Sequence, residues 1–180
     1  TILFSVTFFV AVTAVPLYAV LVGFDAFEIS MFFILLILSG ISITGGYHRL
    51  WSHKAYDAHP IVKAFFAFWG AAAVQNSILI WSSGHRRHHR HIDDNDKDPY
   101  SINRGFWFAH IGWMLRDYPS SQLDFSNVRD LQRDPIVMLQ HNYYLTWVIL
   151  STVAVPLRLG YLNGDVLGMA LIGVVRLVVN

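Results

Sequence analysis

Five of the nine histidines in this chain stand in two short clusters. The first cluster is His48-Arg-Leu-Trp-Ser-His53, and the second is His85-Arg-Arg-His88-His89. Each cluster follows a long apolar run. Imidazole is a common metal ligand, and its reference pKa of about 6.5 leaves it largely neutral at physiological pH. The two clusters therefore predict a metal site at the edge of a membrane.

The second cluster has the spacing of residues that share one face of a helix. His85, His88 and His89 stand at i, i+3 and i+4, about 300° and 400° round a helix axis, so their side chains would converge. His48 and His53 are five residues apart, or about 500°, and would diverge on a straight α-helix. If both bind one metal site, we expect the helix to end or bend between them.

The number of clustered histidines bears on the kind of metal. Imidazole binds both iron and zinc, but five histidines exceed the usual four ligands of a zinc site, which favours two metal ions and iron. Metal-bound histidines usually donate their second N–H to a carboxylate or carbonyl. Candidate partners, which could equally form a solvated acidic loop, are Asp93, Asp94, Asp96 and Asp98. The unclustered histidines are more typical of a basic membrane edge or of hydrogen-bonded side chains: His59, His91, His110 and His141.

Composition places the clusters in a membrane protein. Hydrophobic residues make up 54% of the chain and charged residues 14%, against roughly 25% charged residues in soluble domains. Residues 1–24 and 29–47 contain no charge, and each run is close to the ~20 residues that cross a bilayer. No cysteine is present, which excludes disulfides and thiolate ligands. The net charge of +1 gives no reason to expect a nucleic-acid partner.

These runs predict an all-α integral-membrane fold with one domain over residues 1–180. Eleven of the 13 Lys and Arg residues lie between Arg49 and Arg133, so the positive-inside rule puts that region in the cytoplasm. We expect the bacterial inner membrane rather than the endoplasmic reticulum. The cytoplasmic helical cap would cover residues 83–135, and the transmembrane helices, the fourth truncated, would cover about 2–22, 27–47, 143–157 and 166–180.

Residues 64–84 are uncharged and long enough to span the bilayer. A span there would put the two histidine clusters on opposite sides of the membrane, where they could not share a site. Polar residues also interrupt the run. We therefore expect segment 60–82 to lie at the interface, or to dip into the membrane and return.

Together, the two clusters resemble the first two histidine boxes of the integral-membrane fatty acyl desaturases. The likeness is closest to the stearoyl-CoA Δ9 type and its bacterial relatives, and it is dense from about Gly40 to Asp134. Further residues that support it are Gln75-Asn76 ahead of Trp81, Asp98-Pro99, and Gly105-Phe-Trp-Phe-Ala-His110-Ile-Gly-Trp113.

The resemblance implies an enzyme that holds two iron ions with histidines, uses O2 as co-substrate and inserts a cis double bond into a long acyl chain. The substrate would be an acyl-CoA or an acyl lipid. Electrons would come from ferredoxin, rubredoxin or cytochrome b5 with its reductase. By this likeness Gln75 and Trp81 would line the bend of the acyl tunnel, with Asn76 near the polar end of the substrate. The implied iron ligands are His48, His53, His85, His88 and His89.

Two departures from the family pattern stand out. The third box, of the HxxHH kind, is absent and would lie beyond Asn180, so we expect this chain to be part of a longer protein and inactive alone. Ser83-Gly84 replaces the Arg-Asp pair that animal acyl-CoA enzymes place before the second box, which weakens the inference of coenzyme A as the carrier.

Two other functions remain open on the sequence. A related membrane hydroxylase, acting on a fatty acid or an alkane, would use the same metal site to form an alcohol instead of an alkene. A non-catalytic membrane protein could bind metal through the histidines and change no lipid. A transporter should place polar ligands at mid-membrane depth, and the predicted spans offer little beyond Thr44 and a few serines.

Overall fold

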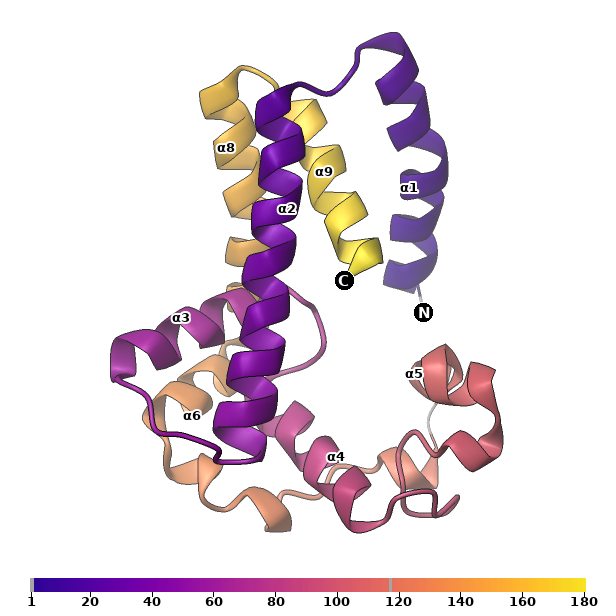
Figure 1. Cartoon of the computed structure of the whole chain (residues 1–180), viewed down its shortest axis with the longest axis vertical. Coiled ribbons are helices and arrows are strands. Elements are labelled where there is room, and N and C mark those ends of the chain that lie inside the picture. The colour runs from indigo at the N-terminus through magenta and orange to yellow at the C-terminus, as the bar shows by residue number, and fades with distance from the viewer. Residues whose placement is uncertain (1, 117) are drawn as a thin grey trace.

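The computed structural model describes residues 2–116 and 118–180, and these contain helices and connecting turns but no β-strand. Residue 1 and residue 117, which falls in the predicted cap segment, lie outside the described residues. Figure 1 shows an upper bundle and a lower cap. The bundle consists of α1 (Ile2–Leu21), α2 (Ala26–Ile41), α8 (Val155–Asn163) and α9 (Val166–Val179). The cap contains α3 (Pro60–Ala71), α4 (Ile78–Arg90), α5 (Trp113–Leu115) and α6 (Pro135–Asn142).

Within the described residues, three helical stretches are long and apolar enough to cross a bilayer: Ile2–Leu21, Ala26–Ser52 and Tyr144–Asn163. The second continues past α2 as a π-helix, η1 (Ser42–Ser52). The third comprises α7 (Tyr144–Ile149), the π-helix η7 (Leu150–Ala154) and α8. α9 has 14 residues, or about 21 Å, short of the ~30 Å hydrocarbon core. The fourth span therefore stays a prediction.

The third stretch extends past residue 157, where we expected it to end. Gly160, three residues past that expected end, is buried inside the helix. A Cβ atom at Gly160 would lie 2.9 Å from Met169 Cβ, so the absence of a side chain lets α8 and α9 approach closely. The helix ends instead before Gly164, whose φ of +86° is the left-handed conformation that commonly terminates helices.

Polar groups join the two turns at the end of the bundle away from the cap. Asp25 and Glu28 form a capping box at the start of α2. Asn163 Nδ2 donates to Asp25 Oδ2 over 3.0 Å, and the Tyr18 hydroxyl donates to Asp165. The turn between α1 and α2 is thereby held beside the turn between α8 and α9.

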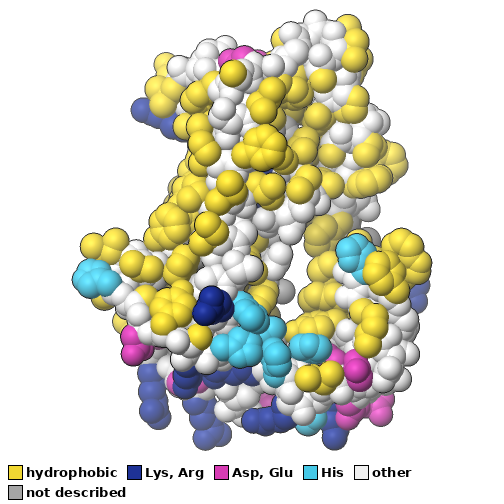
Figure 2. Space-filling model, in the orientation of Figure 1, with side chains coloured by type: hydrophobic (Ala, Val, Ile, Leu, Met, Phe, Trp, Pro, Cys, Tyr) yellow, Lys and Arg dark blue, Asp and Glu magenta, His cyan; other side chains and the backbone are white. Residues whose placement is uncertain are grey.

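Elsewhere the bundle is held by a small apolar core. Leu35, Met169 and Ile172 are buried together, while many other large apolar side chains are exposed; Val20, for example, is 84% exposed. Figure 2 shows this apolar exterior over the upper part of the molecule, with most of the visible Lys and Arg gathered at the opposite end. Such an exterior suits contact with hydrocarbon, which offers no hydrogen bonds to polar side chains.

Segment 60–82 forms two helices separated by a break. α3 has 12 residues, about 18 Å, and is too short to span. Residues 72–77 then turn the chain before α4, and Val74 and Asn76 adopt positive φ angles of 57° and 73°. This break brings α4 back beneath η1, so both histidine clusters lie on one side of the bundle. Placement of the segment at the membrane interface stays a prediction.

Candidate metal centre

The π-helix η1 aligns the two histidines of the first cluster. A π-helix hydrogen-bonds residues five apart, and such turns are frequent at functional sites. The backbone N–H of His53, which caps η1, donates to the carbonyl of His48 over 3.0 Å, so the two side chains lie on neighbouring turns of one face. Their ring centroids are 4.5 Å apart. The helix therefore ends between the two histidines, as their spacing predicted, and its π-helical last turns bring the two rings together.

α4 carries the second cluster, as its spacing predicted. Ser77 is the N-cap of the helix and accepts the Ile80 N–H. Ile78 and Leu79 of the apolar first turn are buried in the apolar core of the lower part of the molecule. The histidines follow in the last two turns. His85 and His89, one turn apart, have ring centroids separated by 4.6 Å.

Four histidines from the two segments form one cluster, which we call the four-histidine cluster: His48, His53, His85 and His89. One ligand nitrogen from each lies within 4.8 Å of the others. His85 Nε2 is 3.0 Å from His53 Nε2 and 3.1 Å from His89 Nε2. Three facing nitrogens at this separation cannot each carry a proton, so unprotonated lone pairs are directed at one small volume, and a cation suits that volume. Figure 2 shows histidine side chains gathered where the apolar surface gives way to the charged end.

The surroundings favour the neutral, ligating form of imidazole. Burial, followed by the charges that neighbouring histidines would carry, lowers the pKa of His85 to about 3. The same causes lower the pKa of His53, with a further contribution from Arg86. Both rings are therefore unprotonated at physiological pH, which is the state that binds metal.

His88 lies beside the four-histidine cluster and is held by another contact. Its Nδ1 is 2.9 Å from Asp98 Oδ1, and its ring centroid is 5.4 Å from that of His89. Asp98 is fully buried and also accepts the backbone N–H groups of Asp93 and Tyr100. A carboxylate fixed in this way sets the orientation and tautomer of an imidazole and raises its basicity as a ligand. With Nδ1 held in this way, Nε2 of His88 is left as a further candidate ligand beside the four-histidine cluster.

Comparison with known proteins identifies the family. The sequence pattern described as "Fatty acid desaturase" matches residues 27–180, which include both histidine clusters. The chain belongs to the fatty acid desaturase family. With three candidate spans in the described residues, it is an integral-membrane protein.

Relatives of this chain include proteins of fungi and animals. The "Probable acyl-CoA desaturase" of Schizosaccharomyces pombe is 47% identical over 131 residues, 72% of this chain and 27% of that protein. "Stearoyl-CoA desaturase 5" of Homo sapiens is 40% identical over 126 residues, covering 67% and 37%. "Acyl-CoA Delta12-desaturase" of Acheta domesticus is 39% identical over 162 residues, covering 85% and 44%. The chain thus spans between a quarter and a half of the length of these relatives.

Of the three residues predicted to contact substrate, Trp81 lies against the four-histidine cluster, and Gln75 is joined to it through Trp81. The Trp81 ring stacks on His85, with centroids 4.8 Å apart and planes 22° apart. Trp81 Nε1 donates to Gln75 Oε1 over 3.3 Å. Asn76 lies in the break before α4, in a left-handed conformation that asparagine tolerates. The three residues therefore come together around the start of α4.

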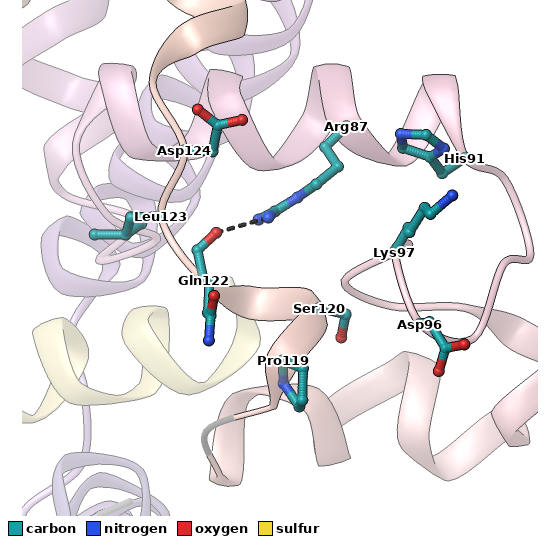
Figure 3. A pocket seen from close by; sticks show the side chains of 9 residues that line it. All are labelled: Arg87, His91, Asp96, Lys97, Pro119, Ser120, Gln122, Leu123 and Asp124. Atoms are coloured by element: carbon teal, nitrogen blue, oxygen red, sulfur yellow. Dashed lines mark hydrogen bonds between the residues drawn. The ribbon is translucent and has the colours of Figure 1, made fainter.

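The unclustered histidines have other surroundings. His59 accepts the Ile61 N–H at the start of α3, and His141 Nδ1 is 2.7 Å from the Ser77 hydroxyl. His110 stacks on Phe106. His91 ends α4 and lines a cavity of about 260 Å3 with Arg87, Lys97 and Gln122, among others. Figure 3 shows this cavity, across which Arg87 donates to the Gln122 carbonyl, and it contains no histidine of the four-histidine cluster.

Polar residues that no sequence pattern indicated hold the site in place. Gln140 of α6 is fully buried, donates to the Tyr47 hydroxyl over 2.7 Å and accepts the Ile78 N–H over 3.1 Å. It thereby joins η1 to the start of α4. Nothing in the sequence around Gln140 marks it, because its partners are 62 and 93 residues away.

Proposed function

We propose that this chain forms part of an O2-dependent acyl desaturase that introduces a cis double bond into a long-chain acyl substrate. The observation that carries the proposal is the four-histidine cluster, assembled from two segments that both fall within the desaturase match. A bundle with an apolar exterior gives the acyl chain access from the membrane.

The donor set fits iron. We propose that two Fe ions are held by His48, His53, His85, His88 and His89, with the fifth histidine and further ligands outside this chain serving the second ion. When bound, iron supplies the activation of O2 and the removal of hydrogen from two adjacent methylenes. Imidazole-rich sites also accept zinc, but a redox reaction with O2 needs a metal that changes oxidation state, which zinc does not.

The residues of this chain have separate tasks in the proposal. Histidine rings that stay neutral hold the metal ions, and Asp98 orients His88. Trp81 stacks the face of its ring on His85 and donates from the ring edge to Gln75. We propose that Trp81 and Gln75 line the bend of the acyl chain and that Asn76 lies near its polar end. The apolar core around Tyr47, Leu50 and Ile78 would exclude water from the reacting methylenes.

The names of the relatives favour an acyl-CoA as the substrate, in preference to an acyl lipid. Δ9 is the proposed position, from the likeness of the histidine clusters to those of the stearoyl-CoA type. One relative is named as a Δ12 enzyme and is 39% identical, so the double-bond position of the product is the test of the Δ9 proposal.

We further propose that α9 belongs to a fourth span and that the metal site faces the cytoplasm. Lys and Arg gather at the cap end, in accord with the positive-inside rule. The electron donor would then be a cytoplasmic-side carrier such as ferredoxin, rubredoxin or cytochrome b5 with its reductase.

Gas chromatography of fatty acids from cells that express the full-length protein with a compatible electron donor tests the proposal. We expect new cis-monoenes that are absent when His88 is replaced by alanine (His88→Ala) and present when His91 is replaced (His91→Ala). The double-bond position follows from the same chromatograms. Hydroxylated chains would overturn desaturation in favour of the related hydroxylase. An unchanged profile would overturn both activities.

A further inference from the structure

Arg86 stands on α4 between the metal-site histidines but points away from them. It follows His85 by one residue, which is about 100° round the helix. A guanidinium has five N–H donors in a rigid planar fork, and each of the five meets an oxygen atom. The acceptors are the Trp51 carbonyl at 2.7 Å, the Ser52 carbonyl at 2.9 Å, the Asn127 carbonyl at 2.8 Å and both oxygens of Asp130 at 2.8 and 3.0 Å.

Two of these acceptors end the π-helix of the first cluster. The last carbonyls of a helix have no partner within it, and Trp51 and Ser52 are the last residues of η1, directly before His53. By accepting from Arg86, they join the turn that carries His53 to the helix that carries His85.

Asp130 forms ion pairs with two cationic side chains, and each of them directly follows a histidine of one of the two clusters. Besides the fork of Arg86, it accepts Lys54 Nζ over 3.0 Å. Lys54 follows His53, and Arg86 follows His85. The Arg86 side chain is only 18% exposed and that of Asp130 32%, so water competes little for this pair. Lys54 is 62% exposed, so its ion pair with Asp130 contributes little to stability.

We propose that Arg86 and Asp130 form a clamp that sets the separation between the His48–His53 turn and α4, and with it the metal affinity of the four-histidine cluster. Both are positioning residues, because neither offers an atom to the cluster. The clamp needs arginine rather than any cation. A lysine has three donors around a point charge and cannot reach two carbonyls of η1, one of the 127–130 loop and both carboxylate oxygens together.

The test is a Co2+ titration of the full-length protein after removal of its metal, followed by the visible absorption of the bound ion. Arg86→Lys keeps the charge and removes the fork, and Asp130→Asn keeps the shape and removes the charge. We expect each to weaken Co2+ binding at least about tenfold and to alter the absorption bands, as loss of an outer partner does at other metal sites. Arg87→Lys, the adjacent position on α4, is the matched control and should stay within about twofold.

A double variant separates a clamp from two independent effects. If Arg86 and Asp130 act as one unit, Arg86→Lys with Asp130→Asn should bind Co2+ no more weakly than the worse single variant. Multiplied losses in the double variant would overturn the clamp, and so would single variants that bind as the wild type does. Far-UV circular dichroism of the metal-free proteins identifies any variant that has lost its helices. If Asp130→Asn has lost its helices, Asp130→Glu, which keeps the charge, is titrated in its place. A Co2+ affinity and absorption bands equal to those of the wild type in Asp130→Glu would overturn the clamp.

The clamp proposal rests on one part of the proposed function, that the four histidines bind metal, and it does not require desaturase activity. The clamp and the desaturase activity can therefore fail separately. Wild-type protein that binds Co2+ and makes no alkene would remove the desaturase activity and leave the clamp in place. Alkene formation with unaltered Co2+ binding in Arg86→Lys would remove the clamp alone. Wild-type protein that binds no Co2+ would overturn both.

Discussion

The bundle has a small apolar core and polar links between the turns at its far end, whereas in the cap buried polar groups join the segments that carry the histidines. Leu35, Met169 and Ile172 form the bundle core. In the cap, Gln140 links η1 to α4, and Arg86 links the end of η1 to Asp130. Apolar contacts are non-directional and tolerate exchange of similar residues. Hydrogen bonds of buried groups require particular partners, so the cap can hold four imidazoles in fixed positions relative to one another.

The largest effect that we expect comes from a ligand in the cap. His85→Ala removes the histidine whose Nε2 faces two others. Metal affinity should fall by more than about 100-fold, because loss of an outer partner alone costs about 10- to 100-fold. Metal content of the purified full-length protein, measured by plasma mass spectrometry, checks this. His91→Ala, on the same helix but outside the cluster, should retain its metal, and a metal-free His91→Ala would contradict the assignment.

A buried polar link should matter next. Gln140→Leu keeps the volume but leaves the Tyr47 hydroxyl and the Ile78 N–H without partners, at about 1–3 kcal/mol for each unsatisfied group. We expect unfolding in detergent to be easier by about 2–4 kcal/mol. Gln122→Leu, at an exposed position of the cap, is the control. Equal stability of the two variants would show that the buried link is unimportant.

The clamp carboxylate should make the cap sensitive to acid. Hydrogen bonds from Arg86 hold the pKa of Asp130 well below its usual value of about 3.9. A carboxylate whose pKa is lower in the folded state contributes stability at pH values above its unfolded pKa and loses it as the pH falls towards the folded value. Wild-type protein should therefore lose more stability than Asp130→Asn between about pH 5 and pH 3. Parallel curves of melting temperature against pH for the two proteins would argue against this contribution.

The smallest effect should come from the bundle. Asp25→Ala removes the cap of α2 and the bond from Asn163, at about 1 kcal/mol for a lost N-cap. Melting temperature should fall slightly, while Co2+ affinity stays at the wild-type value because the substitution is at the end of the bundle away from the histidines. Asp57→Ala, an exposed acid in the cap, should change neither quantity. Loss of metal affinity in Asp25→Ala would show that the two regions are coupled.

The bundle could be predicted from the sequence more completely than the cap. Charge-free runs located the first two helices, since hydropathy and length depend only on neighbouring residues. The predicted helix ends were less accurate. The third stretch was expected to end at residue 157, but it continues through Gly160, against which Met169 packs. The spacing of His85, His88 and His89 predicted one shared face, and the structure places His85 and His89 in the cluster, with His88 beside it. The spacing of His48 and His53 predicted that the helix ends or bends between them, and it ends at Ser52.

The sequence by itself determined that this chain crosses a membrane, that its histidines stand in two clusters and that the clusters resemble those of the desaturases. These properties follow from composition and from short-range spacing. Only the tertiary structure decided that η1 is a π-helix, that His88 contacts Asp98 beside the four-histidine cluster, and that Gln140 and Asp130 hold the two segments together. The links through Gln140 and Asp130 depend on hydrogen bonds between residues 44 to 93 positions apart, and such pairings have no local signal.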